Sequence, residues 1–404
     1  MDDIPANPDA VIAAERALAN AFSPHAPINQ ARFFHGRREL VREVVDTVNT
    51  AGLHAVIYGE RGVGKTSLAN MIGEYLGGDT SVSRVICSQG DAFETVIRRA
   101  LSAIKLAMQV PKLGFAAGTS SREFSLWDAL PDPAELAADE AASLVAGLPF
   151  HLVIILDEFD RLPKSETVAF ADFIKALSDR TANTTVVLVG VAEDINSLLA
   201  SHASVERCLR QIHLPRMSEV ELGEIIDNGL AEAGFTMESP KPRGRILAVS
   251  QGFPHYTHLL AQYAGRSALD KNRRVIDEMD VVTGMVRAVD RADQSTRDLY
   301  HRAVTGSRKD HLWREVVTAC ALAASDERGY FSSRDIQDAL AELLNRPANQ
   351  QAFTYHLAKL ISPDHGPLLE RIGAARRFRY RFVNPLMRPF ILMKAINDGL
   401  LPSD

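Results

Sequence analysis

The segment that most constrains the fold of this chain is Gly59-Glu-Arg-Gly-Val-Gly-Lys65-Thr66, which fits the pattern GxxxxGKT. An apolar run at 54–58 precedes it and a helical pattern at 66–75 follows it. A glycine-rich loop between a strand and a helix is the setting in which this pattern binds phosphate. We therefore expect a phosphate-binding loop here. The alternative is a chance glycine-rich turn, which the flanking elements disfavour.

Each position of this loop has a chemical reason. Gly59, Gly62 and Gly64 let the backbone curl until its N–H groups point at phosphate oxygens. The N-terminus of the following helix adds partial positive charge. Lys65 neutralises the β- and γ-phosphates, and Thr66 offers a hydroxyl ligand to Mg²⁺. The sequence thus predicts a site for ATP and Mg²⁺ with the nucleotide-binding residues Gly59, Glu60, Arg61, Gly62, Val63, Gly64, Lys65, Thr66 and Ser67.

Apolar runs bounded by turns alternate with helical patterns between residues 54 and 215. This alternation is typical of βαβ units and predicts the α/β class, with a doubly wound parallel sheet of the P-loop NTPase kind. The expected strands are residues 54–58, 83–87, 151–156, 184–189 and 211–214. Residues 110–133 contain several Gly, Ser and Pro residues and are expected to form a long exposed loop.

Two carboxylates, Asp157 and Glu158, follow the apolar run at 151–156. Parallel sheets bind ligands at the carboxyl ends of their strands. We expect Asp157 to hold the Mg²⁺ shell through water and Glu158 to polarise the attacking water as a general base. An acidic helix cap is the alternative, and the phosphate-binding loop upstream disfavours it. The pair predicts hydrolysis of ATP to ADP and phosphate, and not binding alone.

Two further positions have open alternatives. Glu193 and Asp194 follow the strand at 184–189, where a polar side chain can reach the γ-phosphate, but a helix-capping role is at least as good an interpretation. Arg207 precedes the last strand, where a guanidinium can project into a neighbouring subunit's site as an arginine finger. Arg210 is the alternative finger, and a solvated helix arginine is the alternative role for Arg207.

The chain divides into segments of different pattern. An Ala-rich helical stretch and four prolines predict an N-terminal arm, and the alternating segment is the core. Strand patterns stop near residue 217, where Ser218 and Glu221 form a capping box, so a lid of about four helices is expected. The predicted boundaries are 1–30 for the arm, 31–216 for the core, 217–290 for the all-α lid and 291–404 for a third unit.

The third unit has the pattern of a winged helix, with helices near 311–324, 332–344 and 349–361 and a basic hairpin turning at 373–376. In such modules the third helix enters the major groove of DNA and the hairpin touches phosphates. The residues expected to contact DNA are Gln351, Tyr355, Lys359, Arg376, Arg377, Arg379 and Arg381. The alternative is a protein partner with an acidic surface.

Charge is unevenly distributed along the chain. Residues 291–404 contain 17 Lys+Arg and 13 Asp+Glu, a balance of +4, whereas the rest has a balance of −10. This asymmetry fits nucleic-acid binding at the C-terminal end, and random surface variation is an equally good account.

Other features bear on where the protein works. No run reaches the roughly 18 apolar residues that span a bilayer, and the acidic start differs from a signal peptide. Cys87, Cys208 and Cys320 have no metal-binding spacing and are expected to be reduced thiols. The sequence predicts a cytoplasmic protein without a membrane partner.

Taken together, the motifs resemble the initiator clade of the AAA+ ATPases, in particular origin-recognition-type initiators and STAND-type ATPases. The resemblance rests on GERGVGKT, on LDEFD at 156–160, on VGVAED at 189–194 and on SVERCLRQIHLP at 204–215. Phe34-His-Gly-Arg37 is similar to a short motif that precedes the core in both groups, which implies packing near the adenine. The resemblance covers residues 31–290, and the order of lid and winged helix extends it more weakly to the end.

Two positions depart from the family pattern. Glu193 stands where the family often has Asn. His255 follows Gly252-Phe-Pro254, where the lid often offers an arginine. His255 is expected to line the nucleotide site and to reach the γ-phosphate, with a charge that depends on pH near neutrality. The alternative is a histidine at a helix N-terminus with no catalytic role.

The sequence thus predicts a homo-oligomeric ATPase in which Lys65, Thr66, Asp157 and Glu158 act within one protomer and Arg207 acts from its neighbour. Three functions remain open. The first is an ATPase that remodels or loads DNA, and the second is a STAND-like switch that binds ATP, assembles and signals through a partner. The third is a nucleotide-gated scaffold with negligible hydrolysis.

Overall fold

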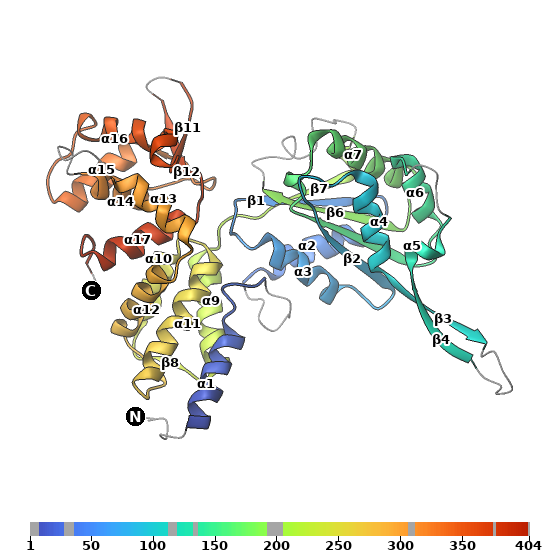
Figure 1. The fold of residues 1–404 in the computed structure, drawn as a ribbon, viewed down its shortest axis with the longest axis horizontal. Helices are drawn as coiled ribbons and strands as arrows, with labels where there is room; N and C mark the ends of the chain where they lie inside the picture. Colours follow the sequence, from blue (N-terminus) through green and yellow to red (C-terminus); the bar gives the residue numbers. More distant parts are fainter. Residues whose placement is uncertain are drawn as a thin grey trace.

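A computed structural model describes residues 8–27, 36–111, 119–131, 136–191, 205–305, 312–374 and 377–402 of the 404-residue chain. The α/β core lies on the right of Figure 1, and the helical lid and the C-terminal unit lie together on the left. Among the described residues, no helix has both the length and the apolar character needed to cross a membrane.

Within the described chain, the core is built on a five-stranded sheet with the order β2-β5-β6-β1-β7, in which all neighbours run parallel. Its strands are β1 (His54–Gly59), β2 (Thr80–Ile86), β5 (His151–Asp157), β6 (Thr184–Val191) and β7 (Leu209–His213). They confirm the five predicted strands and the α/β class. Because β6 lies between β1 and β5, the phosphate-binding loop after β1 and the acid pair after β5 flank the end of β6.

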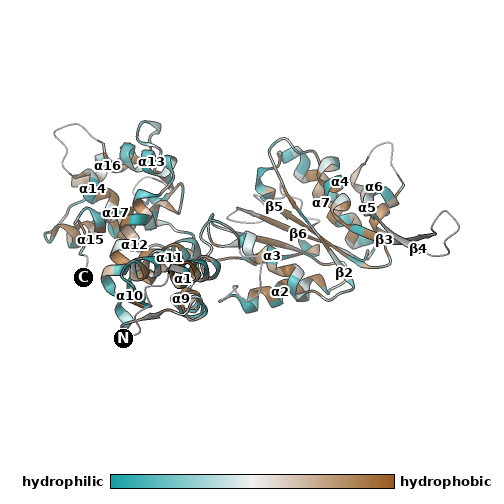
Figure 2. Cartoon of the chain, turned by 60° about the horizontal axis from the view of Figure 1, so that its bottom comes forward, coloured by the Kyte–Doolittle hydropathy of each residue, from teal (hydrophilic) through white to brown (hydrophobic). Residues whose placement is uncertain are grey.

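Helices cover both faces of this sheet. Successive side chains of a strand point to opposite faces, so Val153 and Ile155 pack with one set of helices while Leu152 and Ile154 pack with the other. A strand buried on both faces must be apolar throughout, as the central strands in Figure 2 are. The first face is covered by α2 (Arg38–Val48) and α3 (Lys65–Tyr75), and the second by α4 (Phe93–Ala103), α6 (Ala138–Ala146) and α7 (Lys164–Asp179).

A β-hairpin occupies much of the segment expected to be a long loop, so that prediction was wrong. Strand β3 (Lys105–Pro111) pairs antiparallel with β4 (Thr119–Ser125), and the ribbon projects from the core in Figure 1. The short helix α5 (Leu126–Ala129) follows, opened by a capping box of Ser125 and Asp128. Composition concealed the hairpin because strand formation depends on the partner across the ladder more than on local propensity.

The lid contains the four expected helices among its described residues, and a capping box at Ser218 and Glu221 opens the first. Their bounds are α9 (Glu219–Ala233), α10 (Pro240–Ser250), α11 (Pro254–Asp270) and α12 (Glu278–Asp290), with short parallel strands β8 (Thr236–Met237) and β9 (Val275–Ile276) between them. Helix α1 (Pro8–Ala21) packs on α9 and α11. The helix expected in the N-terminal arm therefore packs with the lid, because its apolar side chains are buried there.

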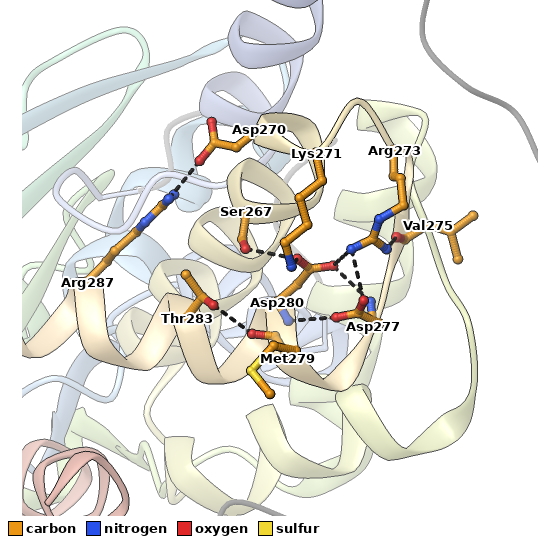
Figure 3. A network of polar contacts seen from close by, with 10 residues as sticks. All are labelled: Ser267, Asp270, Lys271, Arg273, Val275, Asp277, Met279, Asp280, Thr283 and Arg287. Carbon is orange, nitrogen blue, oxygen red and sulfur yellow. Dashed lines mark hydrogen bonds and ion pairs between the residues drawn. The ribbon is translucent and has the colours of Figure 1, made fainter.

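A buried carboxylate fastens one end of the lid (Figure 3). Asp280 is inaccessible to solvent, and it accepts hydrogen bonds from Ser267 Oγ at 2.8 Å, Lys271 Nζ at 2.7 Å and Arg273 Nη2 at 2.9 Å. A buried charge is tolerated when it is paired and fully hydrogen-bonded. The network joins the end of α11 to the start of α12.

The C-terminal unit begins with α13 (Gln294–Val304) and contains the three predicted helices and the predicted hairpin. Its described strands form one three-stranded antiparallel sheet in the order β10-β12-β11. Helix α17 (Met387–Asn397) follows the hairpin and returns to pack on α12 and α14. The remaining elements are α14 (Trp313–Leu322), β10 (Phe331–Ser332), α15 (Ser333–Leu344), α16 (Gln351–Ile361), β11 (Leu369–Ile372) and β12 (Arg379–Phe382).

Candidate nucleotide site

A cavity of about 980 Å³ lies where β1, β5 and β6 end and the lid begins. It brings together the phosphate-binding loop and the acid pair, which are some 90 residues apart in the sequence. The core lines it with Arg37, Arg61, Gly62, Val63, Gly64, Lys65, Thr66, Ser67, Asp157, Glu158, Asp160, Arg161, Gly190 and Val191. The segment after α1 contributes Ser23, Pro24, His25, Ala26 and Pro27. The lid contributes Met217, Ile225, Pro254, His255 and His258.

The loop has the geometry of an anion site. Gly64 has a left-handed backbone conformation (φ 99°) and precedes α3 without a side-chain cap. The first N–H groups of the helix therefore face the cavity beside the loop. Lys65 is buried, and its Nζ donates to Gly59 O at 3.0 Å and to Glu60 O at 2.7 Å. Burial lowers the pKa of Lys65 to about 8, although Asp160, Asp157 and Glu60 oppose the shift. A phosphate group would supply the negative charge that this desolvated ammonium needs.

Gly59 and Glu60 contribute differently from the rest of the predicted loop. Their carbonyl groups accept from Lys65, and the Glu60 carboxylate forms an ion pair with Arg216 at 2.6 Å. The cavity-lining part of the loop therefore starts at Arg61.

Asp157 is 3% exposed, and two groups fix its carboxylate. Its Oδ1 accepts from the backbone N–H of Glu158 at 2.9 Å, and its Oδ2 pairs with Arg84 Nη2 at 2.5 Å. Arg84 lies on β2 and also donates to Asn70 Oδ1 of α3. Arg84 was not predicted, because nothing in the sequence pairs a residue of β2 with the acid at the end of β5.

Glu158 stands at the turn after β5 in a left-handed backbone conformation (φ 54°, ψ 36°). Its Oε2 accepts from Arg161 Nη1 at 2.6 Å. Two residues on, Asp160 Oδ1 accepts from the backbone N–H of Val191 at 2.7 Å, which ties this turn to the end of β6. The turn is thus held at the cavity edge by side chains that the sequence analysis did not single out.

The residues expected at the metal ion fit Mg²⁺ by their chemistry. Thr66 and Asp157 line the same cavity, one with a hydroxyl and one with a carboxylate. Mg²⁺ prefers such oxygen ligands, and it is usually bound by one or two protein groups together with substrate phosphates.

Arg37 closes the cavity from the segment before α2. It is 3% exposed, and it donates to Val63 O at 2.8 Å and to Pro215 O at 2.6 Å. Burial lowers its pKa to about 10, while Glu221 acts in the opposite direction. Arg37 thus fastens the phosphate-binding loop to the start of the lid. Phe34 and His35 of the same motif lie outside the described residues.

His255 lines the cavity from the N-terminal end of α11. Its Nδ1 donates to Pro24 O at 2.7 Å, and burial lowers its pKa. The histidine therefore connects the lid to the segment after α1. Glu193 and Asp194, the other sensor candidates, lie outside the described residues.

The two arginine-finger candidates lie away from the cavity of their own chain. Arg207 is 69% exposed in its side chain and pairs with Asp179 at 3.0 Å, just before β7. Arg210 is also exposed and borders a groove with Glu39, Glu43 and Asp46. Arg207 thus stands at the sheet edge opposite the nucleotide cavity.

The predicted DNA-contacting residues fall into two groups. On α16, Gln351 and Tyr355 are exposed and Lys359 is half-buried. In the hairpin, Arg379 pairs with Asp326 at 2.8 Å and Arg381 pairs with Glu370, so internal carboxylates neutralise part of the basic charge. Arg377 is exposed, and Arg376 lies outside the described residues.

The C-terminal unit also touches the phosphate-binding loop. A methyl group at Gly62 would lie 2.7 Å from Leu386 Cδ2, so the Leu386 side chain packs directly on the loop. Tyr256 of the lid donates to Leu386 O at 2.8 Å. A methyl group at Gly329, in the turn before β10, would lie 2.6 Å from Glu60 Oε1 and 2.7 Å from Arg216 Nη2. Sequence reasoning missed this contact.

The strand order, the loop after β1 and the acid pair after β5 define a P-loop NTPase of the AAA+ type. A family model described as Novel STAND NTPase 1 matches residues 21–263, which is more than half of the chain. The chain therefore belongs to this nSTAND1 family, and the suspected resemblance to STAND-type ATPases is confirmed. A search of curated proteins gives no match.

Several solved structures are similar. The Walker-type ATPase PABY2304 of Pyrococcus abyssi is 15% identical, with 91% of this chain and 99% of that chain covered at a TM-score of 0.52. Cdc6p from Pyrobaculum aerophilum is 14% identical, with 95% and 99% covered at a TM-score of 0.47. The Holliday junction branch migration motor RuvB of Thermotoga maritima is 15% identical, with 92% and 97% covered at a TM-score of 0.45. At these identities the likeness concerns the fold alone.

Proposed function

We propose that this chain is a Mg²⁺-dependent ATPase that works as a nucleotide-controlled oligomeric switch of the STAND kind. Support for ATP binding comes from one observation above all, the single cavity that Lys65, Thr66, Asp157 and Glu158 line together. The loop and Lys65 bind the phosphates, and Thr66 and Asp157 hold Mg²⁺, which supplies positive charge to the γ-phosphate when bound. Glu158 accepts a proton from the attacking water.

Support for a switch comes from the contact between Leu386 and Gly62. A loop that changes its contacts with the nucleotide also changes the surface on which the C-terminal unit rests. A ligand shifts such an equilibrium by its difference in affinity for the two states. ATP binding and hydrolysis would thus alter the hold of the C-terminal unit and free it for a partner. Arg207 of a neighbouring protomer would complete the site on assembly.

The first test separates binding from hydrolysis. Lys65→Ala removes the buried ammonium, and we expect nucleotide binding to fall by at least about 100-fold, since a charge-assisted contact is lost in a desolvated site. Glu158→Gln keeps the shape of the side chain but removes the base, so binding persists and turnover falls by about 10²–10⁴. The measurements are binding of a fluorescent ATP analogue and phosphate release. Unchanged turnover in Glu158→Gln would remove the assigned role, and turnover near zero in the wild-type chain would favour the scaffold.

The second test concerns assembly. Size-exclusion chromatography with light scattering, without nucleotide and with ADP or ATP, is expected to show larger species with ATP. Arg207→Ala should leave nucleotide affinity unchanged and lower turnover at high protein concentration, because the finger acts between protomers. Arg98→Ala, which removes a half-exposed arginine elsewhere on the core, is the control. An effect of Arg207→Ala that is independent of protein concentration contradicts a role between protomers.

A second candidate function is DNA binding through a winged helix formed by α14–α16 and the β11–β12 hairpin. The exposed Gln351 and Tyr355 on α16 favour it, while the internal ion pairs of Arg379 and Arg381 favour a protein partner. Duplex DNA affinity against salt concentration distinguishes the two. DNA as ligand predicts a steep salt dependence that weakens when Lys359 and Arg377 are both changed to Ala. A slope near zero leaves the protein-binding switch.

A further inference from the structure

Three cationic side chains besides Lys65 line the described part of the nucleotide cavity, and they differ in what holds them. Arg37 is buried and fixed by two backbone carbonyl groups. Arg61 belongs to the phosphate-binding loop itself. Arg161 lines the cavity from the turn after β5, and its side chain is bound to Glu158.

The pair of Arg161 and Glu158 is placed where it would obstruct hydrolysis. Glu158 must offer a free carboxylate to water, yet its Oε2 accepts from Arg161 Nη1 at 2.6 Å. Both side chains are about half exposed, at 54% for Arg161 and 47% for Glu158. An ion pair so open to water is weak and exchanges its partners readily.

A γ-phosphate is a stronger partner for this guanidinium. Lys65 sets the β- and γ-phosphates at the loop, so the γ-phosphate points toward the ends of β5 and β6, where Arg161 lines the cavity. A terminal phosphate carries more negative charge than a carboxylate and offers three acceptor oxygens, and arginine binds it through parallel N–H···O bonds. ADP has no group at this position.

We propose that Arg161 recognises the γ-phosphate and acts as a positioning residue for Glu158, which it holds until a triphosphate takes its place. This inference rests on the proposed function, because it assumes that the cavity binds ATP. Arg161 then makes two contributions. It adds affinity for ATP over ADP, and it frees the Glu158 carboxylate only when a hydrolysable phosphate is present.

The experiment compares equilibrium binding of ADP and of a non-hydrolysable ATP analogue, both with Mg²⁺, in four proteins: the wild type, Arg161→Ala, Glu158→Gln and the double variant. Arg161→Ala should lose about tenfold or more in affinity for the analogue and less than twofold for ADP. Glu158→Gln releases Arg161, so it should gain a few-fold in affinity for the analogue. That gain should shrink in the double variant. Arg98→Ala, which removes a similarly exposed Arg–Glu pair on α4, is the matched control and should change neither affinity.

The outcomes separate the inference from the proposed function. Equal losses for ADP and the analogue in Arg161→Ala would mean that the arginine only supports the local fold, and would overturn the inference. A gain in Glu158→Gln that persists undiminished without Arg161 would also overturn it, since the two residues would then act independently. A wild-type protein that binds neither nucleotide would remove the proposed function itself, and this role with it.

Discussion

At the scale of single residues, His54 makes the stability of the core depend on pH. It is 1% exposed at the start of β1, and its Nδ1 accepts from the backbone N–H of Val186 at 3.0 Å. Burial lowers the pKa of His54 to about 4, although the backbone of Ile174 acts to raise it. The folded protein therefore keeps His54 neutral at a pH where the unfolded chain binds a proton.

This difference predicts a loss of stability on acidification. Above pH 6.5, neutral His54 contributes about 3 kcal/mol to the free energy of unfolding. This contribution falls as the unfolded chain takes up a proton, and it is lost by about pH 4. His54→Asn keeps an acceptor for Val186 but no longer titrates, so its stability should fall less between pH 7 and 5. Urea unfolding at the two pH values measures the difference. Equal pH slopes in both proteins would contradict the assignment.

The residues that meet in the nucleotide cavity could be predicted, whereas their neighbours could not. Lys65, Thr66, Asp157 and Glu158 were found because spacing along one chain segment fixes their relation to a strand end. Arg84 and Arg161 were missed for two different reasons. Arg84 reaches Asp157 only through the pairing of β2 with β5, and Arg161 shares its spacing of three from an acidic residue with Arg42 and Arg273, so that spacing alone does not single it out.

At the scale of elements, α1 packs in the lid and leads directly into a segment that lines the nucleotide cavity. Leu18 is fully buried, and a methyl group at Gly265 of α11 would lie 2.6 Å from its Cδ2. The segment from Ser23 to Pro27, which follows α1, lines the cavity. A change that loosens α1 should therefore weaken the lid and the nucleotide site together.

We predict that Leu18→Ala lowers the free energy of unfolding by about 2–5 kcal/mol, because it leaves a cavity between α1 and α11. Affinity for nucleotide should fall as well. Ile12→Ala is the matched control on the same helix, since its side chain is 46% exposed, and it should change stability by about 0.5 kcal/mol or less. Thermal and urea unfolding measure the first effect. If both variants lost the same stability, α1 would not be an integral part of the lid.

The elements differ in how far the sequence predicts them. The central core strands β1, β5 and β6 are buried on both faces and largely apolar, so their runs were visible, as was the capping box at Ser218. The strand order β2-β5-β6-β1-β7 could not be predicted, because it depends on which helix crosses which face of the sheet. The β3–β4 hairpin was missed because strand formation depends on the partner across the ladder more than on local propensity. Helix α1 was assigned to an arm because its partners in α9 and α11 lie about 200 residues or more away in the sequence.

At the scale of the whole molecule, one apolar core continues from the α2–α3 face of the sheet through the lid to the C-terminal unit. The sequence predicted the three parts but not this continuity. At this junction between the core and the C-terminal unit, Arg216 also forms a bidentate ion pair with Glu60, with N···O distances of 2.6 and 3.0 Å. Arg388 anchors α17 within the C-terminal unit through Ala321 O, Ala323 O and Ser325 Oγ.

If this junction controls the nucleotide, then weakening it should change how fast nucleotide leaves. Leu386→Ala removes the side chain that packs on Gly62, and Arg216→Ala removes the ion pair with Glu60. Losing a half-buried leucine contact costs about 1 kcal/mol, which corresponds to roughly a fivefold change in rate if the contact holds the loop closed. We therefore expect nucleotide to dissociate about fivefold faster from Leu386→Ala, and faster still from the double variant.

Stopped-flow displacement of a fluorescent ADP analogue measures this rate, and small-angle X-ray scattering should show a larger radius of gyration for the double variant. Leu322→Ala is the matched control, because Leu322 lies on α14 of the same unit and is exposed. Faster nucleotide dissociation without a larger radius of gyration would mean that the Leu386 contact shapes the phosphate-binding loop but does not hold the C-terminal unit in place. Equal rates in Leu386→Ala and Leu322→Ala would show that the C-terminal unit rests on the loop without controlling it, and the switch would then need another connection between nucleotide and partner.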